Sequence, residues 1–251
     1  MKLSLLTLMG ALSLTTALPR HSTQWHRAST TQGFDISNHQ ELVDFKAAFS
    51  SGARFVLIKS TEGSSSVDPL YESHLAGARS TPLITGASHL ALPDASSASE
   101  QVSFFLQTSG GWRPDNQTLP GVLDLEKNPH GSDPCYDLPP DQLISWIKEF
   151  IVGHREVTGR VPLLHTTTEW WTQCTGNARG FGREVPLVLA ASAGSGGGNG
   201  TGIGPSVLPG DWEKYTIRQN SGSHGFGGGS DVFNGGVREL FQLVTGGIWW
   251  L

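Results

Sequence analysis

Two acidic side chains stand close together inside an otherwise apolar stretch of this chain. The segment VLDLE at 122–126 places Asp124 and Glu126 two residues apart. On a β-strand this spacing sends both side chains to one face, with Cα atoms about 7 Å apart. Like charges this close raise the pKa of one carboxyl, which then stays protonated near neutral pH and can act as a general acid. A merely solvated or salt-bridged pair is the alternative. Because burying charge is costly, the apolar surroundings favour catalysis, such as the cleavage of glycosidic bonds.

Three more acidic residues stand at or beside the ends of expected strands: Asp35, Glu62 and Asp231. In a β/α barrel the carboxyl-terminal strand ends build the active site, so we expect these side chains to gather around the central pair. Glu62 has two interpretations, a contact with substrate and a structural bond to the backbone.

Two histidines are candidates for substrate contacts. His89 lies on an expected strand and either lines the cleft or is a core residue with satisfied hydrogen bonds. His165 either donates to a sugar hydroxyl or titrates near the ordinary histidine pKa of about 6.5.

Short apolar runs alternate with helical patterns along most of the chain. The helices are expected at 41–49, 70–79, 96–107 and 141–157. The strands are expected at 33–37, 55–60, 83–90, 122–126, 161–166, 186–192, 215–219 and, more weakly, 231–233. Apolar runs of this kind are typical of strands buried on both faces, as in a parallel barrel. The order predicts an α/β fold, a single barrel domain over residues 32–247.

Composition narrows the possible partners. The chain has 251 residues, a net charge of −5 and only 16% charged residues, without a run of lysine or arginine. It therefore has no electrostatic footprint for nucleic acid, and nothing basic to attract an anionic membrane. Two cysteines alone cannot form a zinc site, so no metal is expected, and a monomer is the default expectation.

The chain carries signals of export. Residues 1–17 resemble a signal peptide, residues 18–31 a linker or short pro-segment, and residues 248–251 form an apolar tail too short for a membrane anchor. In an oxidising compartment the even cysteine count favours a bridge between Cys135 and Cys174. Asn116 and Asn199 begin glycosylation sequons. We therefore expect a secreted, extracellular protein.

Several motifs together resemble one known family. They are GFDIS at 33–37, IKSTEG at 58–63, DLEKNP at 124–129, TGRVP at 158–162, TTTEWW at 166–171, CTGN at 174–177 and DVFNG at 231–235. In this order they resemble glycoside hydrolase family 25, the Chalaropsis-type lysozymes, and the fungal branch in particular. The likeness runs from about residue 33 to residue 245.

The resemblance implies a distorted barrel of five βα units followed by three strands. It also implies hydrolysis of the β-1,4 bond between N-acetylmuramic acid and N-acetylglucosamine in bacterial peptidoglycan, without a cofactor. By position Glu126 is the general acid, and Asp124 steadies the substrate's acetamido group or the positive charge that develops beside it. Asp35 and Asp231 complete the acidic cluster at the cleft floor. The cysteines fall where fungal members place their disulfide.

The sequence departs from the family pattern mainly where aromatic residues are usual. The departures are at Ser88, Lys127, His165, Val188, Ser192, Arg218 and Asn220. Aromatic rings supply much of the contact area in a sugar cleft, so their loss predicts a rebuilt cleft. Two hypotheses follow: an active hydrolase, with peptidoglycan or another amino-sugar polymer as substrate, and a weakened enzyme or glycan-binding protein on the same scaffold.

Overall fold

A computed structural model describes residues 30–190, 207–224 and 228–246 of the chain. The expected signal peptide, nearly all of the linker, the apolar tail, Ser192 and Asn199 lie outside these ranges. No helix within them combines the length and the apolar character that crossing a bilayer requires.

Within the described ranges, eight strands close into a barrel, and a ninth, very short strand forms a hairpin with one of them. The strands are β1 (Thr31–Ile36), β2 (Phe55–Glu62), β3 (Ser66–Val67), β4 (Ile84–Leu90), β5 (Val122–Asp124), β6 (Leu163–Thr166), β7 (Leu187–Leu189), β8 (Ile217–His224) and β9 (Gly228–Phe233). From β1 through β2, β4, β5, β6 and β7 to β8 all neighbours are parallel. Strand β9 closes the barrel by running antiparallel to both β8 and β1.

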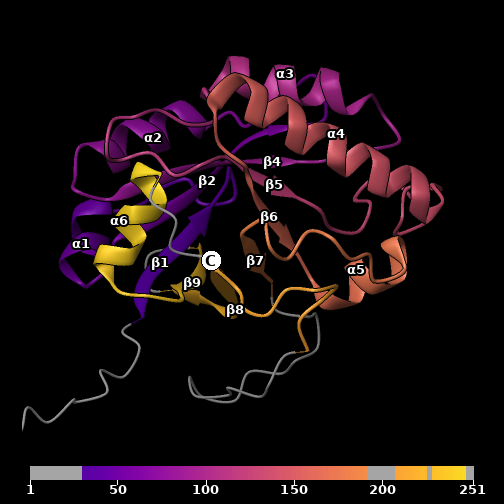
Figure 1. Ribbon diagram of the computed structural model, residues 1–251. Coiled ribbons are helices and arrows are strands. Elements are labelled where there is room, and N and C mark those ends of the chain that lie inside the picture. The colour runs from indigo at the N-terminus through magenta and orange to yellow at the C-terminus, as the bar shows by residue number, and fades with distance from the viewer. Residues whose placement is uncertain (1–29, 191–206, 225–227, 247–251) are drawn as a thin grey trace, which may run out of the picture.

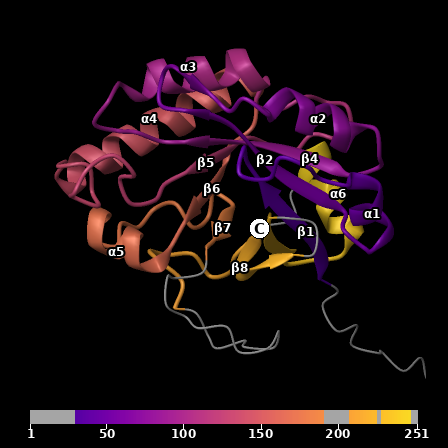
Figure 2. The same ribbon diagram turned by 180° about the vertical axis from the view of Figure 1, so that it is seen from behind.

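Helices follow each of the early barrel strands. They are α1 (Phe45–Ser50), α2 (Tyr71–Arg79), α3 (Ala98–Ser109), α4 (Pro140–Thr158), α5 (Thr168–Thr175) and α6 (Val237–Thr245). Helices α1 to α5 surround the outside of the barrel, whereas β7, β8 and β9 lie together on the remaining side (Figure 1 and, from behind, Figure 2). The predicted five βα units followed by three strands are confirmed.

The longest helix shows how local sequence sets these bounds. Helix α4 begins with Pro140 in its first turn, where the missing N–H costs no hydrogen bond. Leu143, Ile147 and Phe150 form its buried stripe. It ends at Gly159, which adopts the left-handed conformation with φ 72°. The apolar stripe fixes α4 against the outer face of the barrel.

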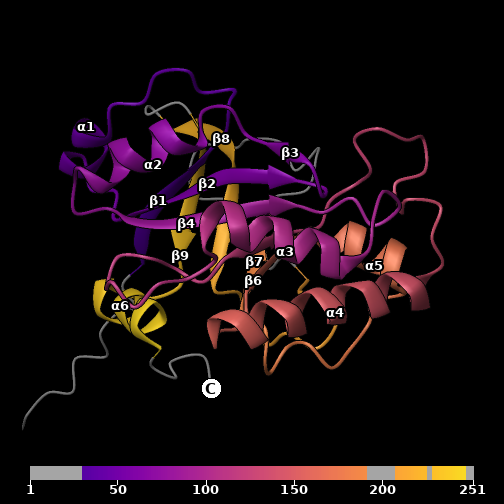
Figure 3. The ribbon, with the colours of Figure 1, turned by 90° about the horizontal axis from the view of Figure 1, so that it is seen from above.

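Apolar residues fill the barrel itself. Phe55, Leu163 and Ile217 belong to a buried cluster that also includes Leu240, Leu243 and Val244 of α6. Burying each such side chain contributes roughly 1.5–3 kcal/mol. Helix α6 lies near the end at which β2 and β4 begin, opposite to the β3 hairpin (Figure 3). Helix α6 therefore closes this end of the barrel, and the polar side chains lie at the opposite end.

Candidate active site

The predicted carboxylates meet at the end of the barrel where the parallel strands finish. Val122 and Leu163 are buried inside the barrel. Side chains two residues apart share a face, so Asp124 and His165, two positions further along, point toward the same interior at its mouth. Ile217 and Phe233 also belong to the inner cluster. By the same alternation, the side chains of Gln219 and Asp231, two positions away from them, point into the barrel.

A chain of hydrogen bonds joins side chains from four strands. The Asp124 carboxylate contacts Nδ1 of His165 directly. Nε2 of His165 lies 3.3 Å from the amide oxygen of Gln219. The Gln219 amide nitrogen in turn donates to Oδ2 of Asp35 over 2.9 Å. Gln219 was not among the predicted site residues, although it lies between the departures Arg218 and Asn220.

His165 is poised to be positively charged. Burial by itself lowers the pKa of His165, but the negative charge of Asp124, its hydrogen bond, and the charges of Asp35 and Glu126 outweigh that effect. The net result raises the pKa of His165 well above its ordinary value. The side chain is only 14% exposed, so bulk water screens these charges weakly.

Glu126 has the properties of a proton donor. Burial and then the charge of Asp124 raise the pKa of Glu126 to about 7, against the opposing effects of His165, Lys59 and Lys127. Residue 126 is nevertheless exposed to solvent. A carboxyl that packs against protein on several sides and is open to solvent on another has both properties. Such a group is accessible to a substrate and half protonated near neutral pH.

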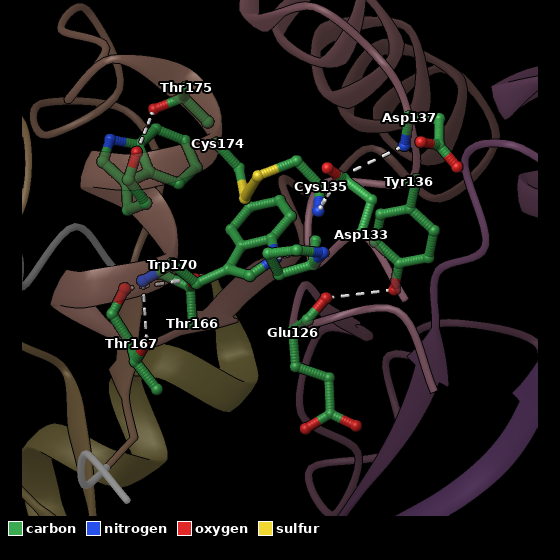
Figure 4. Close-up of a disulfide and its surroundings, with 12 residues drawn as sticks. Glu126, Asp133, Cys135, Tyr136, Asp137, Thr166, Thr167, Trp170, Cys174 and Thr175 are labelled. Atoms are coloured by element: carbon green, nitrogen blue, oxygen red, sulfur yellow. Dashed lines mark hydrogen bonds between the residues drawn. A yellow bond between two sulfur atoms is a disulfide. The ribbon is translucent and has the colours of Figure 1, made fainter. Parts of the chain in front are cut away.

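A cross-linked loop holds the main chain of Glu126. The predicted disulfide between Cys135 and Cys174 is present and ties the loop after β5 to helix α5 (Figure 4). Next to it, the hydroxyl of buried Tyr136 lies 3.0 Å from the main-chain oxygens of both Glu126 and Ala91. The Glu126 carboxyl extends away from the disulfide (Figure 4). Tyr136 therefore fixes the backbone of Glu126 and leaves its side chain free.

Glu62 lies at the same mouth because of a β-bulge. The register between β2 and β4 shifts after Lys59, so that Lys59 pairs with Ser88 but Thr61 pairs with His89. In a regular strand, residues three apart face opposite sides. The bulge instead lets Glu62 contact Lys59 at 2.6 Å. Glu62 also contacts His130 of the loop after β5 at 2.7 Å.

The contacts with Lys59 and His130 favour the ionised form of Glu62. Burial raises its pKa, but bonds and charges from Lys59 and His130 outweigh that effect and hold the pKa of Glu62 below its usual range. The Glu62 carboxylate links strand β2 to the loop after β5, which favours the structural interpretation over a free substrate contact.

Asp231 is a buried carboxyl. The residue is 1% exposed, and neither carboxyl oxygen has a hydrogen-bond partner among the residues that the structure describes. Burial, then the charge of Asp35, raises the pKa of Asp231 well above its ordinary value, although His165 opposes the shift. Asp231 thus lies at the floor of the cluster, where burial favours its neutral form, and it reaches solvent far less than Glu126 does.

The expectation that His89 lines the cleft is wrong. His89 is fully buried on the outer face of β4, stacked on Phe150 with ring centroids 5.2 Å apart. Its two ring nitrogens contact Thr61 at 2.8 Å and Gln101 at 3.0 Å. Burial lowers the pKa of His89 to about 4. It is the satisfied core histidine that the sequence allowed as its alternative.

The departures from the family pattern do not all face the cleft. Val188 is 1% exposed and packs inside the barrel. Arg218 and Asn220 flank Gln219 on β8 and so alternate with it to the other face. Ser88 is half-buried at the mouth, paired in register with Lys59, and Lys127 is exposed. Among the described departures, Ser88 and His165 face the barrel mouth, whereas Ser192 lies outside the described residues.

Within the described ranges, no group of three or more histidine, cysteine, aspartate or glutamate residues is arranged to hold a metal ion. The chemical resources found at the mouth are carboxylates, an imidazole, an amide and a lysine.

Comparison with known proteins agrees with this geometry. Residues 34–223 match the profile described as Glycosyl hydrolases family 25. This chain belongs to glycosyl hydrolases family 25. An N,O-diacetylmuramidase of Arthroderma benhamiae is 43% identical over 98% of this chain and 100% of its own length. An N,O-diacetylmuramidase of Chalaropsis sp. is 42% identical over 86% of this chain and 100% of its own.

Solved structures of family 25 show the same architecture. A family GH25 lysozyme from Aspergillus fumigatus superposes with a TM-score of 0.80, at 47% identity, over 86% of this chain and 100% of that one. A muramidase from Trichobolus zukalii gives 0.79 at 40% identity, over 86% and 99%. As a family 25 member, the chain is a glycosidase of the muramidase type. The matched stretch contains Asp35, Asp124, Glu126 and His165 and stops before Asp231.

Proposed function

We propose that this protein is a secreted muramidase in which Glu126 is the general acid. Its substrate is the β-1,4 bond between N-acetylmuramic acid and N-acetylglucosamine in bacterial peptidoglycan. The observation that carries the proposal is the solvent-accessible Glu126 carboxyl, whose pKa burial and the charge of Asp124 raise to about 7. The names of the two N,O-diacetylmuramidase relatives support the choice of substrate.

The chemistry follows from the two carboxyls. Protonated Glu126 gives its proton to the glycosidic oxygen as the bond to the anomeric carbon breaks. Asp124, ionised, stabilises the positive charge that develops at the sugar ring or its acetamido group. Water then adds to the anomeric carbon, and the Glu126 carboxylate accepts a proton from it. Asp35 reaches this centre through Gln219, and Asp231 lies beneath it.

Export is part of the proposal. Residues 1–17 act as the signal peptide and residues 18–31 as a linker or short pro-segment. The disulfide between Cys135 and Cys174 supports an oxidising destination. Asn116 is exposed in a surface turn, where a glycan has room. Mass spectrometry of secreted protein tests cleavage and glycan occupancy at Asn116 and Asn199 directly.

The decisive experiment compares wild type with Glu126→Gln on purified peptidoglycan. We expect the variant to lose roughly 10²- to 10⁴-fold in the rate of muropeptide release, the usual contribution of a general acid. Glu156→Gln, on the exposed surface of α4, is the matched control and should retain full activity. If Glu126→Gln releases muropeptides at the wild-type rate, Glu126 is not the acid.

The proposed substrate, peptidoglycan, has one alternative: a polymer of a substituted or different amino sugar. Half-buried Ser88 stands at the mouth beside Lys59, where the resemblance leads one to expect an aromatic ring. A smaller side chain leaves room for a substituted or different amino sugar. The same assay with deacetylated peptidoglycan and with chitin decides between them. Faster cleavage of either polymer than of peptidoglycan would replace the proposed substrate.

A further inference from the structure

The hydrogen-bond pattern around His165 defines its protonation. Asp35 accepts from the Gln219 amide nitrogen over 2.9 Å, which turns the amide oxygen toward Nε2 of His165. On the other side Nδ1 of His165 contacts the Asp124 carboxylate. Both neighbours of the ring are acceptors, and only the imidazolium has a proton on each nitrogen to give them. A neutral ring would leave one acceptor facing a lone pair.

Charges from several elements surround this ring. Asp124 at the end of β5, Asp35 on β1 and Glu126 beyond β5 are the anionic groups whose charges act on it. Asp231 on β9 also interacts with this ring, and burial and the charge of Asp35 raise the pKa of Asp231 well above its ordinary value. The ammonium group of Lys59 on β2 pairs with Glu62, and its charge also lowers the pKa of Glu126. His165 is therefore the cation bonded directly to Asp124.

We propose that His165 is a fixed cationic partner of Asp124, a positioning residue that orients the Asp124 carboxyl and that limits the pH range over which Glu126 holds its proton. The inference rests on the proposed function, because it gives Glu126 the role of acid. It also adds a residue that touches neither the scissile bond nor the water.

Two consequences follow from this pairing. First, the bond from Nδ1 of His165 holds the Asp124 carboxyl in one orientation at the mouth of the barrel. Second, the positive charge of His165 acts against the charge of Asp124 at Glu126, so the acid releases its proton at lower pH than it otherwise would. A neutral donor at position 165 would keep the hydrogen bond and lose the second effect.

Nuclear magnetic resonance of the full mature chain tests the charge without any substrate. In wild type we expect both ring nitrogens of His165 to remain protonated at least one pH unit above about 6.5, the ordinary histidine value. In Asp124→Asn, the ring should lose a proton at a lower pH than in wild type. A neutral His165 ring in wild type at neutral pH would overturn the proposal.

The effect on Glu126 is tested with His165→Asn, which keeps an N–H donor but carries no charge. Titration of the carbon-13-labelled Glu126 carboxyl should move upward by roughly one pH unit, and the alkaline limb of muropeptide release should move with it. His165→Lys restores a cation and should return both toward wild type. An unmoved Glu126 titration in a folded His165→Asn variant overturns the proposal.

These readouts separate the two ideas. The titrations of His165 and Glu126 need no catalysis, so they test the ion pair even for a chain that releases no muropeptides. Absent release in wild type would refute the proposed function alone.

Discussion

The hydroxyl of Tyr136 lies 3.0 Å from the main-chain oxygen of Glu126. Tyr136→Phe removes this donor and leaves the main-chain oxygens of Glu126 and Ala91 without it. We expect a loss of about 1 kcal/mol in the free energy of unfolding, and a lower kcat with little change in KM, because the backbone of the acid loosens. Tyr71→Phe, at another buried tyrosine on α2, is the matched control. Equal kcat values for the Tyr136 and Tyr71 variants would contradict this role.

Removing the disulfide should destabilise the whole chain. Cys135 and Cys174 are 39 residues apart, and closing a loop of this length stabilises a fold by about 4 kcal/mol in the chain-entropy model. The double variant Cys135→Ala/Cys174→Ala should lose that amount in urea unfolding, and reduced wild-type protein should behave alike. A loss below about 1 kcal/mol would mean that the loop is already closed by packing in the unfolded ensemble.

Asp231 should make the protein less stable as pH rises. Its folded pKa lies above the unfolded value of about 3.9, so between these two values the folded state holds more protons than the unfolded state does. Stability is then highest below that unfolded value and falls by about 1.4 kcal/mol per pH unit above it. Asp231→Asn should remove this slope, measured by urea unfolding across acidic to neutral pH. An unchanged slope would show that Asp231 ionises freely in the folded protein.

His89 should have the opposite influence. Burial lowers its folded pKa to about 4, below the unfolded value of about 6.5, so the unfolded state binds more protons between these limits. Its contribution is fully present above about 6.5 and is lost as pH falls, by about 1.4 kcal/mol per pH unit. His89→Gln should flatten this acid-side slope in urea unfolding, whereas His39→Gln, at an exposed residue, should not. Equal slopes in both variants would refute the assignment.

Most barrel elements could be predicted from the sequence because their signals are local. The apolar runs at 55–60 and 83–90 correspond to β2 and β4, and the stripe at 141–157 to α4. Helix α6 was missed although Leu240, Leu243 and Val244 carry a helical spacing. The short β3 was missed because Ser66 and Val67 carry no strand pattern of their own.

Face assignments were less predictable than the elements. In ITGASHL, the β4 segment, nearly every residue is buried, so polarity does not distinguish the inner from the outer face. The sequence therefore left His89 open between the cleft and the core, and only the structure places it outside the barrel against Phe150. The bulge that turns Glu62 toward Lys59 depends on the pairing with β4, which no local pattern encodes.

The sequence alone determined the order of strands and helices in the barrel, the central pair Asp124 and Glu126, and the cysteine pair. Each of these follows from a short-range sequence pattern or from the resemblance to the family. Only the tertiary structure decided which groups share charge and protons. His165 meets Asp124 across 41 residues, and Gln219 meets Asp35 across 184. A pKa depends on burial and on charges through space. The shifted pKa values of Glu126, His165 and Asp231 therefore arise only once the barrel has closed.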